Sequence, residues 1–162
     1  MKSIEIENIK NLTTALFTGT NFDEFLVTEA YFSTLFDVSI EGHINKDFLN
    51  DEEKELPENK EGSVSWGRVR GYCFELIKGR KTPLKFKIVF RMPSNRVEGF
   101  IRKYGLNFEP EDINALFLNV NYEAGKMWCV TGTSMKAFTL DKSVDEAWDA
   151  QMQKFLLTIQ QV

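Results

Sequence analysis

The stretch "IKGRKTPLKFKIVFRMPSNR", residues 77–96, carries seven basic residues and no acidic one, although the whole chain has a net charge of −4. Between Arg68 and Lys103 there are eleven Lys or Arg residues against two Glu residues. Charge segregated this strongly acts on partners through its electrostatic field. We therefore take the segment as the candidate binding surface. Its seven basic residues are Lys78, Arg80 and Lys81 before the predicted strand 84–92, Lys85, Lys87 and Arg91 on one face of that strand, and Arg96 after it.

Two roles are open for the lysines of this strand. They could contact an acidic protein or a small anion, or they could guard an edge strand against pairing with other sheets. Alternation along "LKFKIVFRM" is explained by folding alone, because the apolar residues face one way and the basic residues the other. The concentration of charge around the strand is not explained in that way.

The segment "FRMPSNR" leads from the strand into a predicted helix start. Free backbone N–H groups at a helix start favour an anion, whereas basic side chains there are mildly unfavourable. Ser94, Arg96 and the nearby Arg91 would then hold a phosphate or a carboxylate. The alternative is that Arg96 simply points into water.

Nucleic acid is a natural partner for a basic strand, but two observations argue against it. The sequence pI is about 5.2. Alternation also sends Phe86 and Phe90 inward, so they would not offer stacking surfaces among the lysines.

The sequence offers little for catalysis. Its one histidine, His43, lies two residues from Glu41, and the pair could transfer protons. Ser134 and Lys136 would share one side of a strand, at a spacing with little specificity. No phosphate-binding loop, nucleophile motif or metal-ligand spacing is present, so we expect no cofactor and favour a protein that is not an enzyme. The two cysteines, Cys73 and Cys129, fit buried free thiols.

The remaining patterns predict one α+β domain over residues 1–162, with a mostly antiparallel sheet of about five to seven strands packed with three to four helices. Helices are predicted near residues 8–19, 64–79, 94–105 and 143–160, the last with a capping box of Ser143 and Glu146. A short edge strand is expected at "SIEI", and hairpins are expected to turn near Ser33–Thr34 and at "EAGK". The acidic segment at about 50–62 predicts an exposed, mobile loop, which could lie over the basic face as a displaceable cover.

The strand "IKGRKTPLKFKIVF", preceded by "NFDEFLVTEAYFSTLFDVSIEGHINKDF", resembles an uncharacterised family of small bacterial proteins. The most specific residues are Lys78, Gly79, Lys81, Thr82 and Pro83. The resemblance implies a bacterial cytoplasmic protein and carries over no catalytic residue.

We therefore expect a non-catalytic binding module with an acidic protein or a small anion as partner and no membrane association, since no run of about 18 apolar residues is present. One alternative is a small enzyme that uses Glu41 and His43. The other is a structural subunit that forms a homodimer through the last helix, which would expose an apolar stripe around Trp148 and Phe155.

Overall fold

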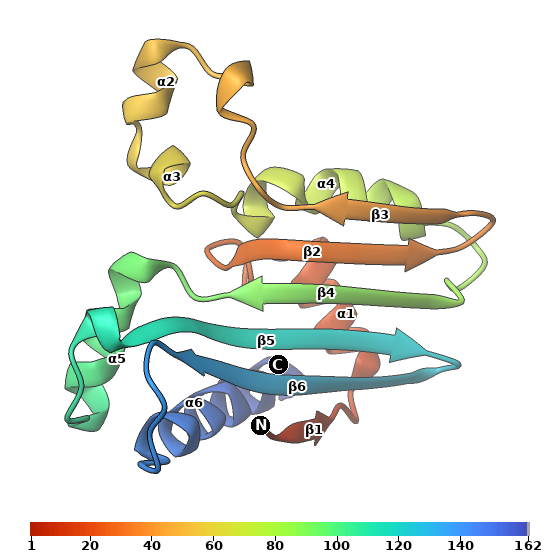
Figure 1. The fold of residues 1–162 in the computed structure, drawn as a ribbon. Coiled ribbons are helices and arrows are strands. Elements are labelled where there is room, and N and C mark those ends of the chain that lie inside the picture. Colours follow the sequence, from red (N-terminus) through yellow and green to blue (C-terminus); the bar gives the residue numbers. More distant parts are fainter. Residues whose placement is uncertain (162) are drawn as a thin grey trace.

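The computed structural model describes residues 1–161, in which six strands form one antiparallel sheet (Figure 1). The spatial order is β1 (Ser3–Glu5), β6 (Lys126–Met135), β5 (Ile113–Glu123), β4 (Lys85–Arg91), β2 (Leu26–Ser33) and β3 (Asp37–Glu41). The predicted α+β class and the single domain are confirmed. Both predicted hairpins and the short N-terminal edge strand are confirmed as well.

Strand β4 lies inside the sheet, between β2 and β5. The interpretation of its lysines as guards of an edge strand is therefore wrong. Alternation of apolar and basic residues specifies which way each side chain faces, and it is the same for an edge strand and for a central strand with one face in water.

The long helices gather on one face of the sheet. In Figure 1, α1 (Ile9–Phe17), α4 (Trp66–Ile77) and α6 (Ser143–Gln160) lie behind the strands, and α5 (Val97–Tyr104) lies at one end. Single-turn 3₁₀ helices occupy Lys46–Phe48, Ser94–Arg96 and Pro110–Asp112. The helix predicted over 64–79 is confirmed as α4, despite its two glycines.

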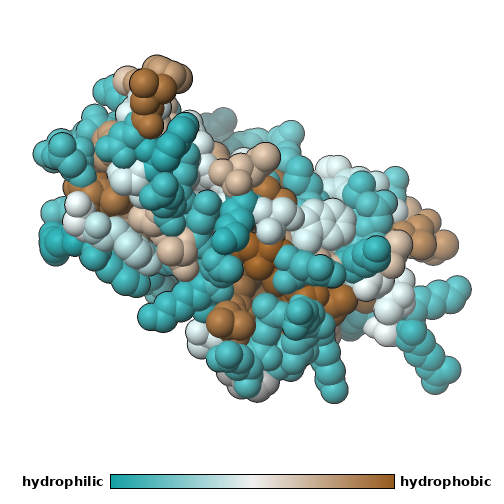
Figure 2. All heavy atoms as spheres, turned by 90° about the horizontal axis from the view of Figure 1, so that it is seen from below, coloured by the Kyte–Doolittle hydropathy of each residue, from teal (hydrophilic) through white to brown (hydrophobic). Residues whose placement is uncertain are grey.

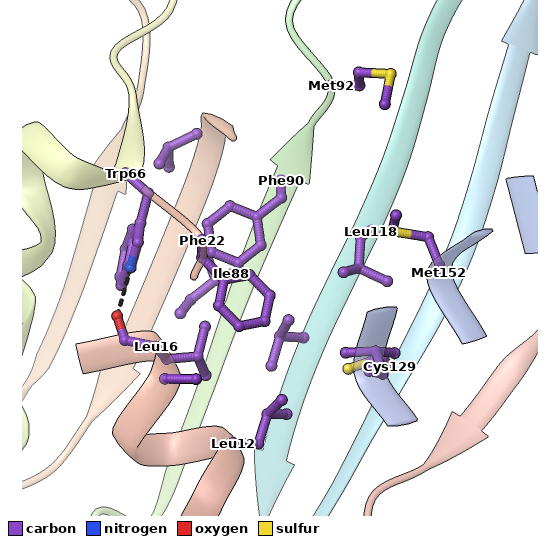
Figure 3. Close-up of a cluster of buried hydrophobic side chains, with 14 of the residues drawn as sticks. Leu12, Leu16, Phe22, Trp66, Ile88, Phe90, Met92, Leu118, Cys129 and Met152 are labelled. Atoms are coloured by element: carbon purple, nitrogen blue, oxygen red, sulfur yellow. Dashed lines mark hydrogen bonds between the residues drawn. The ribbon is translucent and has the colours of Figure 1, made fainter. Parts of the chain in front are cut away.

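An aromatic core joins the helices to the sheet (Figure 3). The rings of Phe22 and Phe90 stack with centroids 5.3 Å apart, and Trp66 meets Phe90 edge to face at 5.3 Å. The indole Nε1 of Trp66 donates a 2.6 Å hydrogen bond to the carbonyl oxygen of Leu16. This bond satisfies a buried polar group at the end of α1 and fixes α4 against that helix.

Segment 50–62 is exposed, as predicted, but it is not an irregular loop. It contains α2 (Asp51–Glu55) and α3 (Pro57–Lys60), which project beyond the β3 edge (Figure 1). Asn50 and Glu53 form a capping box at the start of α2, and Asn59 is buried. Local capping and one buried amide order these turns without an apolar core.

The start of α6 also differs in detail from the prediction. Ser143 is the first helical residue and caps nothing with its side chain. Instead, the carboxylate of Asp141 accepts a 2.8 Å hydrogen bond from the Ser143 backbone N–H, and this bond lowers the pKa of Asp141. The helix dipole favours a carboxylate near a helix start. Here the carboxylate of Asp141 accepts a backbone N–H hydrogen bond, as a capping side chain would.

Candidate functional site: the α6 groove

The eight residues predicted to bind an anion fall in three separate places. Lys78, Arg80 and Lys81 lie in the connection that enters β4, and Ser94 and Arg96 follow its exit. Because β4 has seven residues, its two ends are about 20 Å apart. No single small anion contacts both groups.

The entry group lies in the exposed connection between α4 and β4. The Lys78 ammonium is 2.7 Å from the carboxylate of Glu75, one turn earlier in α4. Arg80 and Lys81 are exposed to solvent. Their charged side chains therefore lie in solvent at this end of the sheet.

Lys85, Lys87 and Arg91 share the sheet face opposite the helices, as predicted. They have acidic neighbours there, because Glu123 lies opposite Lys85 and Glu29 lies opposite Val89. The face around the three basic residues is therefore mixed in charge.

Aromatic residues from neighbouring strands stand on this lysine face. Tyr31 is the cross-strand partner of Lys87, which also pairs with Asn121, and Asn121 in turn pairs with Trp128. Directly opposed residues project to the same side of a sheet. Phe86 and Phe90 face inward, as predicted, but Tyr31 and Trp128 supply aromatic side chains on the lysine face, so only the low pI still argues against nucleic acid.

At the exit of β4, the end of the acidic segment already occupies the predicted donors. The carboxylate of Glu61 accepts from the Ser94 backbone N–H at 3.2 Å and from the Ser94 hydroxyl at 2.9 Å. The guanidinium of Arg91 donates to the Glu61 carbonyl oxygen at 3.3 Å. Residue 61 thus lies over Ser94 and Arg91, as the hypothesis of a cover expects at this one point.

Arg96 turns the other way, into the rim of a groove of about 400 Å³ beside α6, which we call the α6 groove. Its guanidinium pairs with the carboxylate of Glu24 from the turn before β2. Volumes of this order are at the lower end of those that hold small ligands.

The floor of the α6 groove is apolar and formed by three regions of the sequence. It is made by Phe25, Met92, Met152, Phe155 and Ile159. Phe25 and Phe155 have ring centroids 5.8 Å apart, and each packs against Phe22 of the core. The core thus holds the floor in place, so the groove is preformed.

The rim of the α6 groove is predominantly basic. Arg96, Lys103 and Lys154 line it together with one carboxylate, that of Glu24. The Lys103 ammonium also lies 5.3 Å from the ring centroid of Tyr104. An apolar floor under a cationic rim suits a molecule with an apolar body and an anionic group.

Sequence reasoning identified Arg96 but missed the rest of the groove. Phe25 and Phe155 are separated by 130 positions, and each reads locally as an ordinary core residue. Lys154 lies on the polar face of α6, where a lysine needs no special explanation. Only the packing of α6 beside the turn before β2 brings them together.

The pair considered for catalysis is open to water. The Nδ1 atom of His43 is 3.6 Å from a carboxylate oxygen of Glu41, and the two side chains are 63% and 80% exposed. Neither residue lines the α6 groove. Within residues 1–161 no group of three or more His, Cys, Asp or Glu side chains could hold a metal ion.

The C-terminal helix uses its apolar stripe within the monomer. Trp148 is fully buried, and its indole Nε1 donates to the carbonyl oxygen of Phe117 at 2.8 Å. Phe155 is half-buried in the groove floor. The exposed apolar stripe around Trp148 and Phe155, which the dimer interpretation expects, is therefore not present on α6.

Both cysteines are buried free thiols, as predicted. Burial raises the pKa of each thiol to about 12. The thiolate is the reactive form of cysteine, so neither side chain is suited to act as a nucleophile.

Fold and site together define a small α+β protein with a one-sided antiparallel sheet and a preformed groove at the end of its central strand. The chain belongs to a family of unknown function, DUF5721, which it matches over residues 15–161. No curated protein and no solved structure matches it. None of the helices in residues 1–161 is long and apolar enough to cross a membrane.

Proposed function

We propose that the protein is a non-catalytic binding module that holds a small amphipathic anion in the α6 groove. The observation that carries the proposal is the combination of an aromatic floor with three cations and one carboxylate at the rim. Of the two partner classes expected from the sequence, a small anion suits this groove better than an acidic protein surface.

The ligand's apolar part would lie on Phe25 and Phe155, and its carboxylate or phosphate would meet Arg96. A guanidinium binds either group through two parallel N–H donors. Lys154 and Lys103 would add charge at the rim, where solvent weakens each contribution.

Glu24 is an intramolecular competitor in this proposal. Its carboxylate occupies Arg96 in the structure, as a ligand's anionic group would. Because the pair is exposed to solvent, separating it costs little, and an incoming anion can displace Glu24.

The other residues predicted to bind an anion do not contact the ligand in this proposal. Lys78, Arg80, Lys81, Lys85 and Lys87 would act on an acidic partner only through long-range attraction, and Arg91 and Ser94 would become available if Glu61 were displaced. A bacterial origin and a cytoplasmic location stay predictions from the family resemblance.

Thermal unfolding with phenyl phosphate, octanoate and inorganic phosphate tests the proposal, because a ligand that binds only the native state raises the melting temperature. We expect a rise with phenyl phosphate or octanoate, a smaller one with inorganic phosphate, and loss of the effect in Arg96→Ala and Lys154→Glu. Lys81→Ala, at the other end of β4, should behave as wild type. Equal shifts in all the variants, or no shift with any probe, would refute the proposal.

A further inference from the structure

Three large apolar residues lie on neighbouring segments at the opposite end of β4, and we call them the apolar tip: Leu35, Phe36 and Leu84. Leu35 and Phe36 form the β2–β3 turn, which is closed by a 3.1 Å hydrogen bond from the Thr34 N–H to the Phe36 carbonyl oxygen. The Leu84 N–H donates to the carbonyl oxygen of Ser33 at 2.9 Å. The two segments therefore lie side by side at the end of the sheet where β4 begins (Figure 1).

The apolar tip is exposed to solvent. Leu35 is 95% exposed, Phe36 61% and Leu84 67%. Alternation places Phe36 and Leu84 in the apolar series of their strands, but each lies just before the first residue of its strand. Figure 2 shows hydrophobic atoms protruding at the right-hand end of the molecule with hydrophilic side chains beside them.

Basic residues surround the apolar tip. The connection into β4 supplies Lys78, Arg80 and Lys81, Lys85 pairs with Ser33, and Lys126 lies across the β5–β6 turn from Glu123. Acidic residues lie at this end as well: Glu75 is paired with Lys78, Asp37 begins β3, Glu123 ends β5, and Glu5 and Glu7 lie on the β1 edge beside Lys126. The connection from Lys78 to Lys85, which adjoins the apolar tip, carries four basic residues and no acidic one in a chain whose net charge is −4.

We propose that the apolar tip and its lysines dock the protein on the surface of an anionic lipid bilayer. The apolar side chains would enter the interface between headgroups and acyl chains, and the basic residues would remain at the level of the headgroups. This placement accounts for exposed apolar side chains and concentrated charge at one end of the molecule.

Shape and charge favour a bilayer over a protein partner. The three side chains project from two neighbouring turns, and none of them lines the α6 groove. Projecting apolar groups enter a soft interface without needing a matching pocket. The sequence-based expectation of no membrane association rested on the absence of a spanning segment, and docking at a surface requires none.

Another exposed corner of the molecule supplies a matched control. Phe138 is 90% exposed in the connection between β6 and α6, with Lys136 and Lys142 nearby in the sequence. Like the apolar tip, this corner exposes a large apolar side chain, but it has fewer basic residues around it. A general affinity for lipid would involve both corners, whereas docking through the apolar tip involves only one.

Cosedimentation of the full chain with vesicles tests the inference. We expect binding to phosphatidylcholine vesicles that contain phosphatidylglycerol, and much weaker binding to phosphatidylcholine alone. Phe36→Ser should weaken binding about tenfold through lost apolar burial, and Arg80→Ser and Lys81→Ser about fivefold each through lost surface attraction. Phe138→Ser should bind as wild type.

The substituted side chains are all exposed, so the variants should retain the wild-type melting temperature, which is measured alongside. No binding of the wild type to the anionic vesicles would overturn the inference. So would an equal loss in Phe138→Ser and Phe36→Ser. If the wild type did not bind vesicles but bound another protein, and Phe36→Ser abolished that binding, the surface would be a protein interface and the lipid proposal would be wrong.

Discussion

Glu24 and Arg96 form an ion pair across the rim of the α6 groove, although they are separated by 72 positions and only Arg96 was singled out in the sequence. The pair connects the turn before β2 to the segment that follows β4. It also places a protein carboxylate where the proposed ligand's anionic group would bind. The function proposed for the groove depends on whether that carboxylate can be replaced.

Removing the carboxylate of Glu24 should increase affinity for an anion. Glu24→Gln frees the Arg96 guanidinium and makes the rim more positive. An exposed ion pair is worth about 0.2–1 kcal/mol, so we expect the dissociation constant for phenyl phosphate or octanoate to fall by up to about fivefold. Calorimetric titration measures the change.

Glu98→Gln is the control for that variant. Glu98 forms a similarly exposed pair with Arg102 and does not line the groove. It removes the same charge from the chain without freeing Arg96. Equal tightening in Glu98→Gln and Glu24→Gln would show that only net charge matters, and would contradict the role given to Glu24.

A second ion pair should contribute to stability. The guanidinium of Arg70 donates to both carboxylate oxygens of Asp23, at 2.9 and 3.1 Å, and the two side chains are only 24% and 22% exposed. The hydrogen bond to Asp23 raises the pKa of Arg70 further above its usual range. Arg70→Ala leaves Asp23 half-buried without its donors, so we expect a loss of about 1–2 kcal/mol in urea unfolding.

The exposed pair of Arg102 and Glu98 provides the comparison. Because both side chains are largely in water, Arg102→Ala should cost less than about 0.5 kcal/mol. Similar losses in the two arginine variants would contradict the role assigned to Arg70.

The pKa of Cys129 predicts how stability changes at alkaline pH. Burial raises the folded-state pKa of this thiol from 9.0 to about 12, so the folded protein keeps the proton after the unfolded chain has lost it. The contribution is fully present below about pH 9 and is lost as the pH rises toward 12, by up to about 1.4 kcal/mol per pH unit. The difference in unfolding free energy between wild type and Cys129→Ala should therefore shrink above about pH 9.

A thiol reagent gives an independent check of the same burial. Both cysteines should react only after unfolding in denaturant at neutral pH. Rapid labelling of the native protein at Cys129 would contradict the burial of this side chain.

The side-chain amide of Asn59 should keep the acidic segment, residues 50–62, in its ordered conformation. The Asn59 side chain donates to the Glu53 carbonyl oxygen at 2.7 Å and accepts from the Arg68 guanidinium at 2.7 Å. Asn59→Ala removes both bonds while leaving the sheet intact. We expect faster amide hydrogen exchange over residues 51–60, with exchange in β4 unchanged.

An unaltered exchange rate over residues 51–60 in Asn59→Ala would show that Asn59 does not order the segment. The same experiment tests the predicted mobility of residues 50–62. Wild-type exchange there as slow as in β4 would make that prediction wrong.

Local patterns were sufficient to predict most elements. Alternation gave the buried series Phe86, Ile88 and Phe90 of β4, and helical periodicity gave α6 with Trp148 facing inward. These patterns are local because each depends only on which side of a strand or helix is apolar.

Relations between distant segments were not predictable in this way. The interior position of β4 depends on pairing with both β2 and β5, which alternation does not encode. The α6 groove depends on Phe25, Arg96 and Lys154 meeting across more than a hundred positions. The small helices at 51–60 were missed because capping, rather than apolar periodicity, specifies them.

In the proposed function, the α6 groove selects a molecule with both an apolar body and an anionic group, and Arg96 binds the anionic group. Calorimetric titration of wild type and Arg96→Ala with phenyl phosphate, octanoate and inorganic phosphate tests it most directly. We expect phenyl phosphate or octanoate to bind wild type more tightly than inorganic phosphate does, and Arg96→Ala to lose this binding while it still unfolds at the wild-type temperature. Equal binding by the two proteins, or no binding of either amphipathic probe to wild type, would contradict it.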